Sequence, residues 1–592
     1  MFEWEFYFVL FSIAAMIACL IWEIKSPELI IASTVVLFLL TGILTPNEAI
    51  NGFSNEGVMT IGLLFIIAGA VEKSKIVESF FNRLIKGPPT TRLFLFKLLT
   101  PITSLSAFMN NTPIVITLTP IIRKWCEKHN ISPSKLLIPL SYATILGGTI
   151  TLMGTSTNLV VHGLLVEKGM SGFSFFQFAI IGIPITIVGL LYLIFLGYKL
   201  LPNNQVTINS TIENLREYVC EILVGKEYAF IGKSVEEAKL RNLKGLFLVS
   251  IIRDSEHITP VANTTVLKRG DRLLFSGDIS TLSEIQQTKG LNLLTNQGTY
   301  FLSKPQNRLV EAVVSHHSSL LYKKLKDTHF RSKFNAAVIA VHRKNHHIKT
   351  KIGEIELKAG DILLMVVGQD FYKNDHHKDF YLISPVTPNT LVDKNTKRKG
   401  WVSLFLLLCM ITLVTLKVLS IITALGLAVV MLFLFKIITP SEARRYIQWN
   451  VLILIASSFG IGVAILKTGV AIWVANLVIG STASFGIFAT ILAIYFLTNL
   501  FTEVITNNAA AVIMFPIVYE ISEKMQLDPI PLAVIVAIAA SASFSTPIGY
   551  QTNLIVYGPG GYSFKDYLKV GIPLNLITMF VTVTIVYFIW IY

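Results

Sequence analysis

The sequence predicts a polytopic α-helical membrane protein with two related halves and a soluble α/β insert between them. Three observations predict this: apolar composition, an internal repeat, and a change of character in the middle. The chain has 592 residues, of which 53% are hydrophobic, and its mean hydropathy is +0.63. Apolar windows long enough to span a bilayer recur at both ends. They fall at 6–22, 29–44, 176–200, 401–416, 421–438, 451–466 and 572–591.

Four landmarks of the first half recur in the second half in the same order. The pairs are 45–49 with 439–443, 110–112 with 506–508, 154–159 with 549–554, and 172–184 with 561–573. The first three pairs keep an offset of 394 to 396 residues, which indicates a duplication. Duplicated halves whose polar motifs interrupt apolar segments are typical of secondary transporters.

The distribution of Lys and Arg predicts the orientation in the membrane. The loop 72–92 is basic, and so are Arg444 and Arg445 after Pro440, whereas the first-half counterpart of that second loop, 45–57, has no basic residue. Because one loop is basic and its counterpart in the other half has no basic residue, the two loops are expected on opposite sides of the membrane, which predicts inverted repeats. With basic loops inside, each half has five crossings and one re-entrant hairpin, both termini lie outside, and 202–398 is cytoplasmic. The N-terminus carries Glu3 and Glu5 and is expected to begin the first span, not a cleavable signal.

The net charge of +14 is attributed to these cytoplasmic loops, and no nucleic-acid partner is expected. The predicted location is therefore the cell membrane, of bacterial type, with several crossings. The predicted domains are membrane repeat 1 (1–201), insert domain 1 (202–298), insert domain 2 (299–398) and membrane repeat 2 (399–592).

Each half contains a predicted hairpin and a predicted broken helix. The hairpins span about 95–120 and about 490–516, and the broken helices about 136–165 and about 530–558. Non-helical backbone at membrane depth persists only where protein buries it or where it lines a cavity. Broken helices expose N–H groups and carbonyls that suit an anion and a hard cation.

The motifs at these places resemble those of a transporter family. Asn110-Asn-Thr112 and Thr506-Asn-Asn508 resemble the twin Ser-Asn-Thr motifs of the divalent anion/sodium symporter family, within the citrate-transporter-like ion transporter superfamily. Gly154-Thr-Ser-Thr-Asn158 resembles the Gly-Thr-x-x-Asn break of that family. The resemblance implies sodium as the coupling ion, with no cofactor. It implies substrate contacts at Asn111, Thr112, Asn507, Asn508, Thr157 and Thr552, and sodium ligands at Asn110, Gly154, Asn158, Thr506, Thr546, Gly549 and Asn553.

Two departures from the family pattern leave the substrate open. Asn110 replaces the first serine and Asn508 replaces the second threonine, so sulfate, a dicarboxylate or another oxyanion remain candidates.

Glu503 lies one turn before Thr506 in an apolar stretch, where an acid is costly and usually functional. It is a candidate for proton or cation coupling, with capping of a neighbouring backbone group as the structural alternative.

The insert contains a repeat of its own. Leu267-Lys-Arg-Gly-Asp271 matches Leu357-Lys-Ala-Gly-Asp361, and strands are expected at 245–253 and 336–343, with a helical stretch before each strand (234–240; 319–325). These units resemble two RCK C-terminal domains, which implies dimerisation and a small regulatory ligand such as a nucleotide. No Gly-x-Gly-x-x-Gly fingerprint is present.

The predicted function is sodium-coupled symport of a divalent anion by alternating access, in a homodimer within the lipid bilayer. The alternative is a cation/proton antiporter or a metalloid-anion efflux carrier of the same superfamily, which Glu503 favours. A gated channel is less compatible, because no Thr-Val-Gly-Tyr-Gly filter sequence is present. An enzyme is not expected, since no catalytic motif rises above background.

Overall fold

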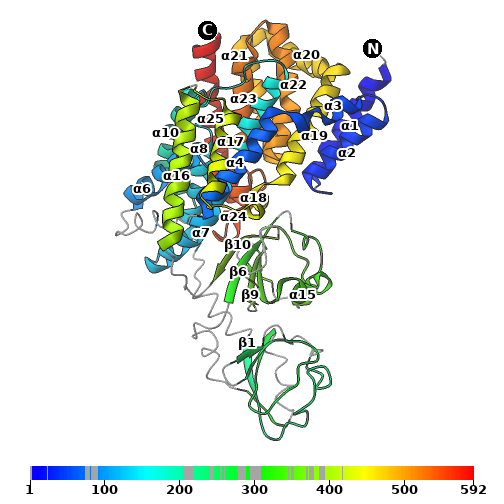
Figure 1. Cartoon of the computed structure of the whole chain (residues 1–592), viewed down its shortest axis with the longest axis vertical. Helices are drawn as coiled ribbons and strands as arrows, with labels where there is room; N and C mark the ends of the chain where they lie inside the picture. The colour runs from blue at the N-terminus through cyan, green and yellow to red at the C-terminus, as the bar shows by residue number, and fades with distance from the viewer. Residues whose placement is uncertain are drawn as a thin grey trace.

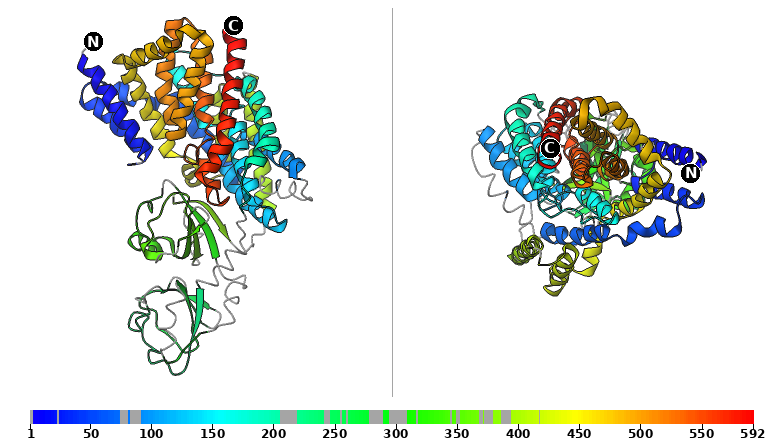
Figure 2. Two further views of the ribbon diagram at one scale, coloured as in Figure 1. Left: turned by 180° about the vertical axis from the view of Figure 1, so that it is seen from behind. Right: turned by 90° about the horizontal axis from the view of Figure 1, so that it is seen from above.

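The computed structural model consists of a helical region and two small sheet modules. Figures 1 and 2 show the modules one below the other, on one side of the helical region, and both termini at its opposite end. Six helices among the described residues are long and apolar enough to span a membrane. The structure describes residues 3–22, 24–73, 81, 91–204, 219–240, 246–253, 256–258, 261–277, 289–293, 309–315, 318–343, 346–348, 352–367, 371, 379–385, 394–416 and 418–592.

Some sequence expectations fall outside these ranges. Lys75, Arg83 and Lys86 of the basic loop 72–92 lie outside the described residues, as does the expected boundary between the two insert domains at 298/299. The expectation of a helical membrane protein with a sheet region in the middle is confirmed.

The helical region consists of two halves, and the helices that carry the repeated motifs follow the same order in both. The first half contains α1 (Glu3–Ile21), α2 (Pro27–Leu40), α3 (Pro46–Ile50), η1 (Asn51–Ser54), α4 (Glu56–Lys73), α6 (Thr91–Ser106), α7 (Asn111–Lys128), η2 (Pro133–Lys135), α8 (Leu137–Gly148), α9 (Ser156–Glu167), α10 (Ala179–Tyr192), η3 (Leu193–Gly197) and α11 (Tyr198–Leu200). The second half contains α16 (Lys394–Thr415), α17 (Ile421–Leu434), α18 (Pro440–Tyr446), α19 (Trp449–Lys467), α20 (Val470–Thr482), η8 (Ala483–Phe485), α21 (Gly486–Val504), α22 (Asn507–Met525), α23 (Pro529–Ser541), α24 (Gln551–Tyr557), α25 (Phe564–Val586) and η9 (Tyr587–Ile591).

The repeated Thr-Pro-x-Glu-Ala motif forms the same local structure twice. Thr45 and Thr439 each cap a short helix, α3 or α18, and in both cases a glutamate three residues later completes a capping box. Proline stands directly after each cap, where its fixed φ favours the first helical turn. This local sequence therefore determines how the chain enters α4 and α19.

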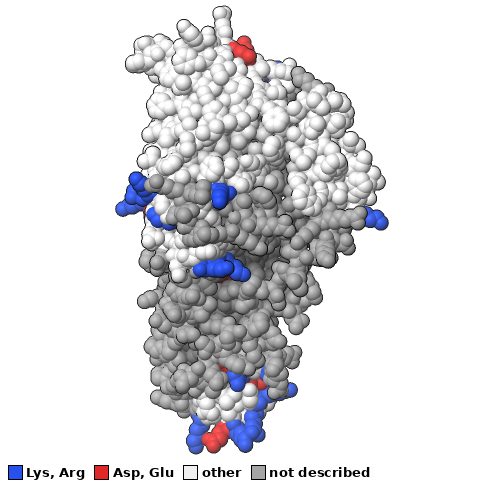
Figure 3. Space-filling model, turned by 90° about the vertical axis from the view of Figure 1, so that its left-hand side faces the viewer, with Lys and Arg blue, Asp and Glu red and all other residues white. Residues whose placement is uncertain are grey.

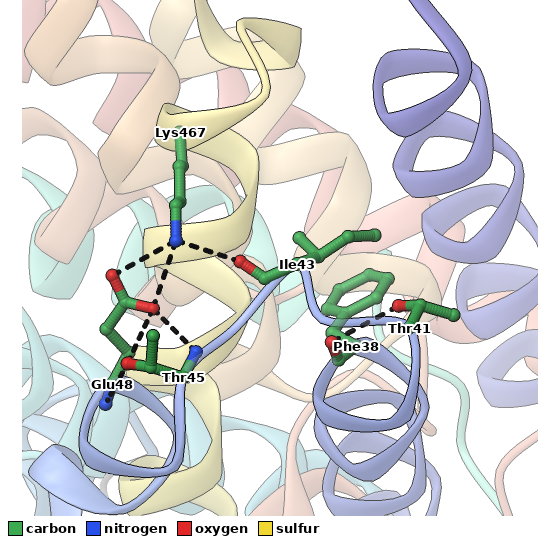
Figure 4. Close-up of polar contacts among 6 residues, drawn as sticks. All are labelled: Phe38, Thr41, Ile43, Thr45, Glu48 and Lys467. Atoms are coloured by element: carbon green, nitrogen blue, oxygen red, sulfur yellow. Dashed lines mark hydrogen bonds and ion pairs between the residues drawn. The ribbon is translucent and has the colours of Figure 1, made fainter. Parts of the chain in front are cut away.

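Lysines exchanged between the halves hold both motifs in place. Lys467, at the end of α19, donates to Glu48 at 3.2 Å and to the carbonyl oxygen of Ile43 at 3.1 Å (Figure 4). Lys73, at the end of α4, donates to Glu442 at 2.6 Å and to the carbonyl oxygen of Ile437 at 3.2 Å. Each half thus supplies the lysine that the other half's motif binds. Figure 1 places α3 toward the end with the termini and α18 toward the sheet modules.

The two sheet modules share one topology. The first sheet has the order β3-β2-β4-β1-β5, and the second has β10-β6-β9-β7-β8, which is the same order read in reverse. Their strands are β1 (Val219–Val224), β2 (Leu246–Arg253), β3 (Glu256–Ile258), β4 (Arg272–Gly277), β5 (Leu291–Leu293), β6 (Leu309–Val314), β7 (Ala336–Arg343), β8 (His346–His347), β9 (Ile362–Val367) and β10 (Phe380–Pro385). The second module also contains η5 (Leu325–Thr328), α15 (Phe330–Phe334) and η6 (Ile352–Glu354).

The Gly-Asp turn of each module is held by a two-point ion pair. Arg253 binds Asp271 through Nε and Nη2 at 2.8 Å each, and Arg343 binds Asp361 in the same way at 2.7 Å each. Two parallel N–H···O bonds fix the planar guanidinium, so the turn is oriented as well as stabilised. Partial burial opposes the charge on Arg343, but its hydrogen bonds to Asp361 are the larger effect and raise the pKa of Arg343.

The expected helical stretches before the strands are wrong. Residues 235–240 form consecutive turns after Ser234, and 319–322 form turns that lead through Lys324 into η5. Bridges from Ser234 to Val266 and from Lys324 to Glu356 pair these segments with extended chain instead. Segments this short have little helical stability of their own, so the tertiary pairing decides their conformation.

The charged residues follow the boundary of the helical region. On the face shown in Figure 3, Lys and Arg gather along the lower margin of the white helical surface and on the lowest module. The exposed side chains of α1, α2 and α16 include Phe11, Leu40 and Phe405, as expected of helices that contact lipid.

Close packing of η1 on α19 generates a stability prediction. A Cβ on Gly52 would overlap the carbonyl oxygen of Ala456, whereas a Cβ on Gly426 of α17 would meet nothing within 4 Å. We expect Gly52→Ala to destabilise the protein by about 1–3 kcal/mol through overpacking. Gly426→Ala, the control, should stabilise it by up to about 1 kcal/mol through helix propensity. Thermal unfolding of detergent-solubilised protein checks both, and equal melting temperatures for the two variants would contradict the described packing.

Candidate functional site

Two helical hairpins place polar tips inside the helical region. In the first hairpin α6 ends at Ser106 and α7 begins at Asn111, and in the second α21 ends at Val504 and α22 begins at Asn507. The polar residues of each tip end one helix and begin the next, because their side chains compete for backbone hydrogen bonds. The predicted tip motifs therefore lie at the N-termini of α7 and α22.

Two broken helices place polar loops beside these tips. The first break lies between α8 and α9, and the second between α23 and α24. Asn158 donates from Nδ2 to the carbonyl oxygens of Gly148 at 3.4 Å and Thr151 at 2.9 Å. Asn553 donates in the same way to Ser543 and Thr546, at 3.0 Å each. One asparagine thus holds each loop closed across the break, and its amide satisfies carbonyls that have no helical partner.

Each tip is tied to the break of its own half by equivalent hydrogen bonds. The Oγ of Ser106 donates to the carbonyl oxygen of Thr144 at 2.8 Å, and the Oγ1 of Thr502 donates to that of Ala540 at 2.6 Å. In addition, Thr151 donates to the carbonyl oxygen of Ala107, and Thr546 donates to that of Glu503 at 3.0 Å. The tip and the break of one half therefore form a single unit.

The tip of each half also contacts the break of the other half. Thr112 Oγ1 donates to Gln551 Oε1 at 3.3 Å, and Ser156 Oγ donates to Asn508 Oδ1 at 3.1 Å. Thr157 Oγ1 lies 3.4 Å from the same Asn508 oxygen. These contacts join residues about 350 to 440 positions apart, and they bring the four repeated motifs together at one place.

Tyr550 extends the contact between the halves. Its hydroxyl accepts a hydrogen bond from Asn111 Nδ2 at 2.7 Å and lies 3.2 Å from Thr155 Oγ1. Behind it, Ser141 Oγ of α8 donates to Asn553 Oδ1 at 2.7 Å and lies 2.8 Å from Thr552 Oγ1. The second break is therefore fixed by side chains of the first half.

Several oxygens at the two breaks are available to a cation. Within the described part of the chain, Asn158 Oδ1, Ser543 Oγ and Thr506 Oγ1 are buried and have no hydrogen-bond partner. A buried oxygen without a partner is costly, and a bound hard cation would remove that cost. Glycine is required next to them, since a Cβ on Gly549 would overlap Ser543 Oγ and lie 3.0 Å from the carbonyl oxygen of Thr502. A Cβ on Gly154 would overlap the backbone of Gly148.

A cavity reaches the site from the side of α4. It has a volume of about 30 Å³ and is lined by Ile61 and Phe65 of α4, by Asn110 of the first tip and by Ser156 of the first break. Most of its wall is apolar, so its polar end is the end formed by the tip and the break. Asn110 therefore faces this cavity, and Asn507 stands at the start of α22 with its side chain partly exposed.

Glu503 belongs to a neighbouring group of polar side chains. Its Oε1 accepts from the backbone N–H of Ser545 at 2.8 Å and from Asn575 Nδ2 at 2.7 Å. Among the side chains that the structure describes, Glu503 Oε2 is buried without a hydrogen-bond partner, and so is Asn575 Oδ1. Glu503 therefore caps a backbone N–H group, which is one of its expected roles. Its second carboxylate oxygen remains available to a proton or a cation.

The structure brings the predicted residues into one region and adds others. The additional residues are Ser106, Ser141, Thr155, Ser156, Ser543, Tyr550 and Gln551. The repeat could have revealed part of this set, because Ser156 and Gln551 occupy equivalent positions in the two break motifs. The role of Ser141 has no such signal, since the position 395 residues later is Val536.

The helical fold, with uncharged polar motifs where two hairpins and two broken helices meet, defines a membrane carrier of the secondary-transporter class. Comparison with known proteins identifies the family to which the chain belongs. The profile of the citrate transporter family matches residues 17–521 and 504–592, and the chain belongs to this family. The family consists of transporters, which is consistent with the expectation that the chain is not an enzyme.

Similar proteins include bacterial and algal transporters. An uncharacterised transporter of Synechocystis is 32% identical over 94% of this chain and 92% of its own length. Sodium/sulfate cotransporter 1 of Chlamydomonas reinhardtii is 24% identical over 93% of this chain and 86% of its own length. A sodium-dependent dicarboxylate transporter of Staphylococcus saprophyticus is 31% identical over only 26% of this chain and 29% of its own length.

The glycine at the second break generates a prediction. Gly549→Ala should displace Ser543 Oγ from the group of oxygens around it and lower the transport rate at least about tenfold, which corresponds to 1.4 kcal/mol. Gly480→Ala is the matched control, because a Cβ at this position of α20 meets nothing within 4 Å. Uptake into proteoliposomes that contain equal amounts of each variant is the measurement. Wild-type uptake by Gly549→Ala would show that this close packing is unimportant for transport.

Proposed function

We propose that the protein is a sodium-coupled symporter of a divalent anion, sulfate or a dicarboxylate, which works by alternating access. The observation that carries this proposal is the meeting of uncharged polar groups from both halves at two hairpin tips and two helix breaks. A divalent anion can be held by neutral donors and helix N-termini while sodium ions supply the compensating charge.

The residues at the tips and the breaks divide into proposed ligands of the anion and proposed ligands of sodium. Asn111, Thr112, Thr157, Asn507, Asn508 and Thr552 would bind the anion, from the tips and from the starts of the second half-helices. Asn110, Gly154 and Asn158 would bind one sodium ion, and Thr506, Thr546, Gly549 and Asn553 another. The buried oxygens of Asn158 and Thr506 support these assignments, and Ser543 joins the second group.

We further propose that the halves are inverted repeats with five crossings and one hairpin each. The reciprocal ion pairs Lys73–Glu442 and Lys467–Glu48 support a two-fold relation, because such symmetry exchanges each contact with its equivalent. Both termini would face outside, and the sheet modules would be cytoplasmic, between proposed domain boundaries at 201/202 and 398/399. The protein would act as a homodimer in the lipid bilayer.

The similar proteins support sodium and a divalent anion. Those named sodium/sulfate cotransporters match over more than nine-tenths of this chain, whereas the named dicarboxylate transporter matches over 26%. The mobile unit would comprise the hairpins and broken helices. The cavity between α4 and the first tip lies between this unit and the remaining helices, where alternating access requires a boundary.

A second candidate function is cation/proton antiport, or efflux of a metalloid anion. The observation that favours it is the buried Oε2 of Glu503, because an exchanged proton requires a titratable group. The equivalent position in the first half is Ala107, so the acid belongs to one half only.

Uptake of labelled sulfate and succinate into proteoliposomes tests the leading proposal. Accumulation that requires an inward sodium gradient would support symport. Accumulation driven by a pH gradient alone, or no accumulation of either anion, would favour the second candidate.

The tip asparagines provide a specific prediction. We expect Asn111→Ala and Asn507→Ala to lower kcat/KM for anion uptake at least about tenfold, because each loses a hydrogen bond to a charged substrate worth about 1.5–3 kcal/mol. Asn204→Ala is the control, since Asn204 binds the carbonyl oxygen of Gly561, away from the two hairpin tips and the two helix breaks. Size-exclusion profiles establish folding. Unaltered uptake by both tip variants would remove these asparagines from the binding site.

Regulation by the insert is also proposed, and the contacts of the second module support it. Arg123 of α7 forms an ion pair with Glu311 of β6 at 2.6 Å, and both side chains are at least nine-tenths buried. A Cβ on Gly558, directly after α24, would lie 2.8 Å from the carbonyl oxygen of Gly360 and 3.1 Å from Ile362. Ile362 and Val313 pack in the core of the membrane helices, whereas their neighbours in the strands form a separate core.

The second module thus contacts α7 and the end of α24, two helices that begin at the site. A shift of the module would move both helices relative to the rest of the protein. We propose that the modules are RCK C-terminal domains that dimerise, bind a small ligand such as a nucleotide and alter transport through these contacts. Arg331 links the two modules, because it donates to the carbonyl oxygens of Leu248 at 2.7 Å and Val261 at 3.1 Å.

The buried ion pair makes this proposal testable. Glu311→Gln removes the carboxylate charge from a buried ion pair, which costs about 3–5 kcal/mol, so we expect the module to detach and transport to change. Arg123→Met combined with Glu311→Met should restore docking, because apolar replacement of both partners is close to neutral. Lys326→Met, which breaks an exposed pair with Glu354, is the control. Limited proteolysis of the insert and uptake are measured together. Identical results for Glu311→Gln and the wild type would refute the coupling.

A further inference from the structure

The residue pair Thr155 and Tyr550 marks the place where the two halves meet. The two residues are 395 positions apart, the offset of the repeat, and each precedes the first residue of a half-helix, α9 or α24. Their backbones match, with φ −141° and ψ 147° at Thr155 and φ −135° and ψ 137° at Tyr550. Their hydroxyl oxygens are 3.2 Å apart. A residue that touches its own repeat equivalent lies on the axis that relates the halves.

The two side chains that meet at this axis differ in size. The threonine hydroxyl stays close to its own backbone, whereas the tyrosine places a ring and a hydroxyl across the axis. The Tyr550 hydroxyl reaches Asn111 of the opposite half at 2.7 Å. Ser106 Oγ lies 2.5 Å from Asn111 Oδ1, so the Asn111 amide has a polar neighbour at both ends. The backbone of the site is nearly symmetric, and its side chains are not.

The Tyr550 ring ends in a hydroxyl that lies between the two halves, beside Asn111 and Thr155. The site residues on either side of the axis are Thr112 with Gln551, and Ser156 with Asn508. A C4 dicarboxylate carries its two charged groups at separate ends and needs donors on both sides of the axis. A tetrahedral oxyanion carries its charge at one centre. Because the Tyr550 oxygen accepts the Asn111 amide hydrogen, its own hydrogen can be donated to an anion oxygen.

We propose that Tyr550 is the selectivity residue of this site: its ring shortens the site and its hydroxyl contacts the anion, so that the site binds a compact tetrahedral oxyanion of the sulfate type in preference to a C4 dicarboxylate. This inference rests on the proposed function, because it concerns the substrate of the same site. It assigns a role to a residue outside the two tip motifs.

Two substitutions separate the ring from the hydroxyl. Tyr550→Phe keeps the ring and removes the donor. Tyr550→Thr removes the ring and gives both halves the same residue, since Thr155 stands at the equivalent position. Tyr192→Phe is the control, because Tyr192 is another largely buried tyrosine whose hydroxyl donates at 2.8 Å to the carbonyl oxygen of Val570, away from the hairpin tips and the helix breaks.

The measurements are sodium-dependent uptake of labelled sulfate, its inhibition by succinate, and the shift in melting temperature that each anion causes in detergent. We expect Tyr550→Phe to raise the KM for sulfate about tenfold, as loss of a hydrogen bond to a charged group predicts, with succinate still excluded. We expect Tyr550→Thr to lower the sulfate-to-succinate preference at least about tenfold, with succinate now raising the melting temperature. Tyr192→Phe should match the wild type.

Several results would overturn the inference. An unchanged preference in Tyr550→Thr would do so, as would a wild type that succinate stabilises as strongly as sulfate does. Sodium-driven uptake of succinate by the wild type would leave the symporter proposal standing and remove the selectivity assignment, whereas uptake of neither anion would remove both. If Tyr550→Thr does not yield monodisperse protein, Tyr550→Phe decides alone, and a wild-type KM for sulfate then overturns the inference.

Discussion

The arrangement of this protein depends on how the backbone groups of two broken helices are satisfied inside an apolar layer. An N–H or carbonyl without a partner costs several kcal/mol in lipid, so a helix can be interrupted there only if side chains complete its hydrogen bonds. Asn158 and Asn553 do this at the two breaks, and Thr151 and Thr546 tie the breaks to the hairpin tips. These bonds keep the tip and the break of each half together.

The two halves share this framework and differ in the side chains placed on it. The positions of Tyr550, Glu503 and Ser141 are polar or large in one half, and the equivalent positions hold Thr155, Ala107 and Val536. A duplicated backbone can bind similar cations at both breaks, because cation ligands include backbone and amide oxygens that both copies possess. Under the proposed function, an anion that lies between the copies would meet both sets of side chains at once. Its selectivity would then be determined where the copies differ.

The insert is connected to the same framework by a short path. Asn111 begins α7 and Arg123 lies in its C-terminal half, so the ion pair with Glu311 and the bond to Tyr550 act on the same helix. The turn at Gly360 packs against the end of α24, whose first residue is Gln551. Two helices thus connect the sheet module with the site, which gives the insert a physical route to influence it.

The sequence by itself determined the membrane class, the two halves, the family resemblance and the places where helices end, because these depend on local composition and on a repeat that can be read directly. It also located the Gly-Asp turns at Asp271 and Asp361, but its helical stretches at 234–240 and 319–325 were wrong, since pairing with distant strands outweighs the helical tendency of short segments. Only the tertiary structure decided that the tip of each half faces the break of the other, that Tyr550 and Thr155 touch, and that Arg123 pairs with Glu311. These contacts join residues about 190 to 440 positions apart, and no local pattern encodes them, because they result from how the helices and the sheet module pack around one another.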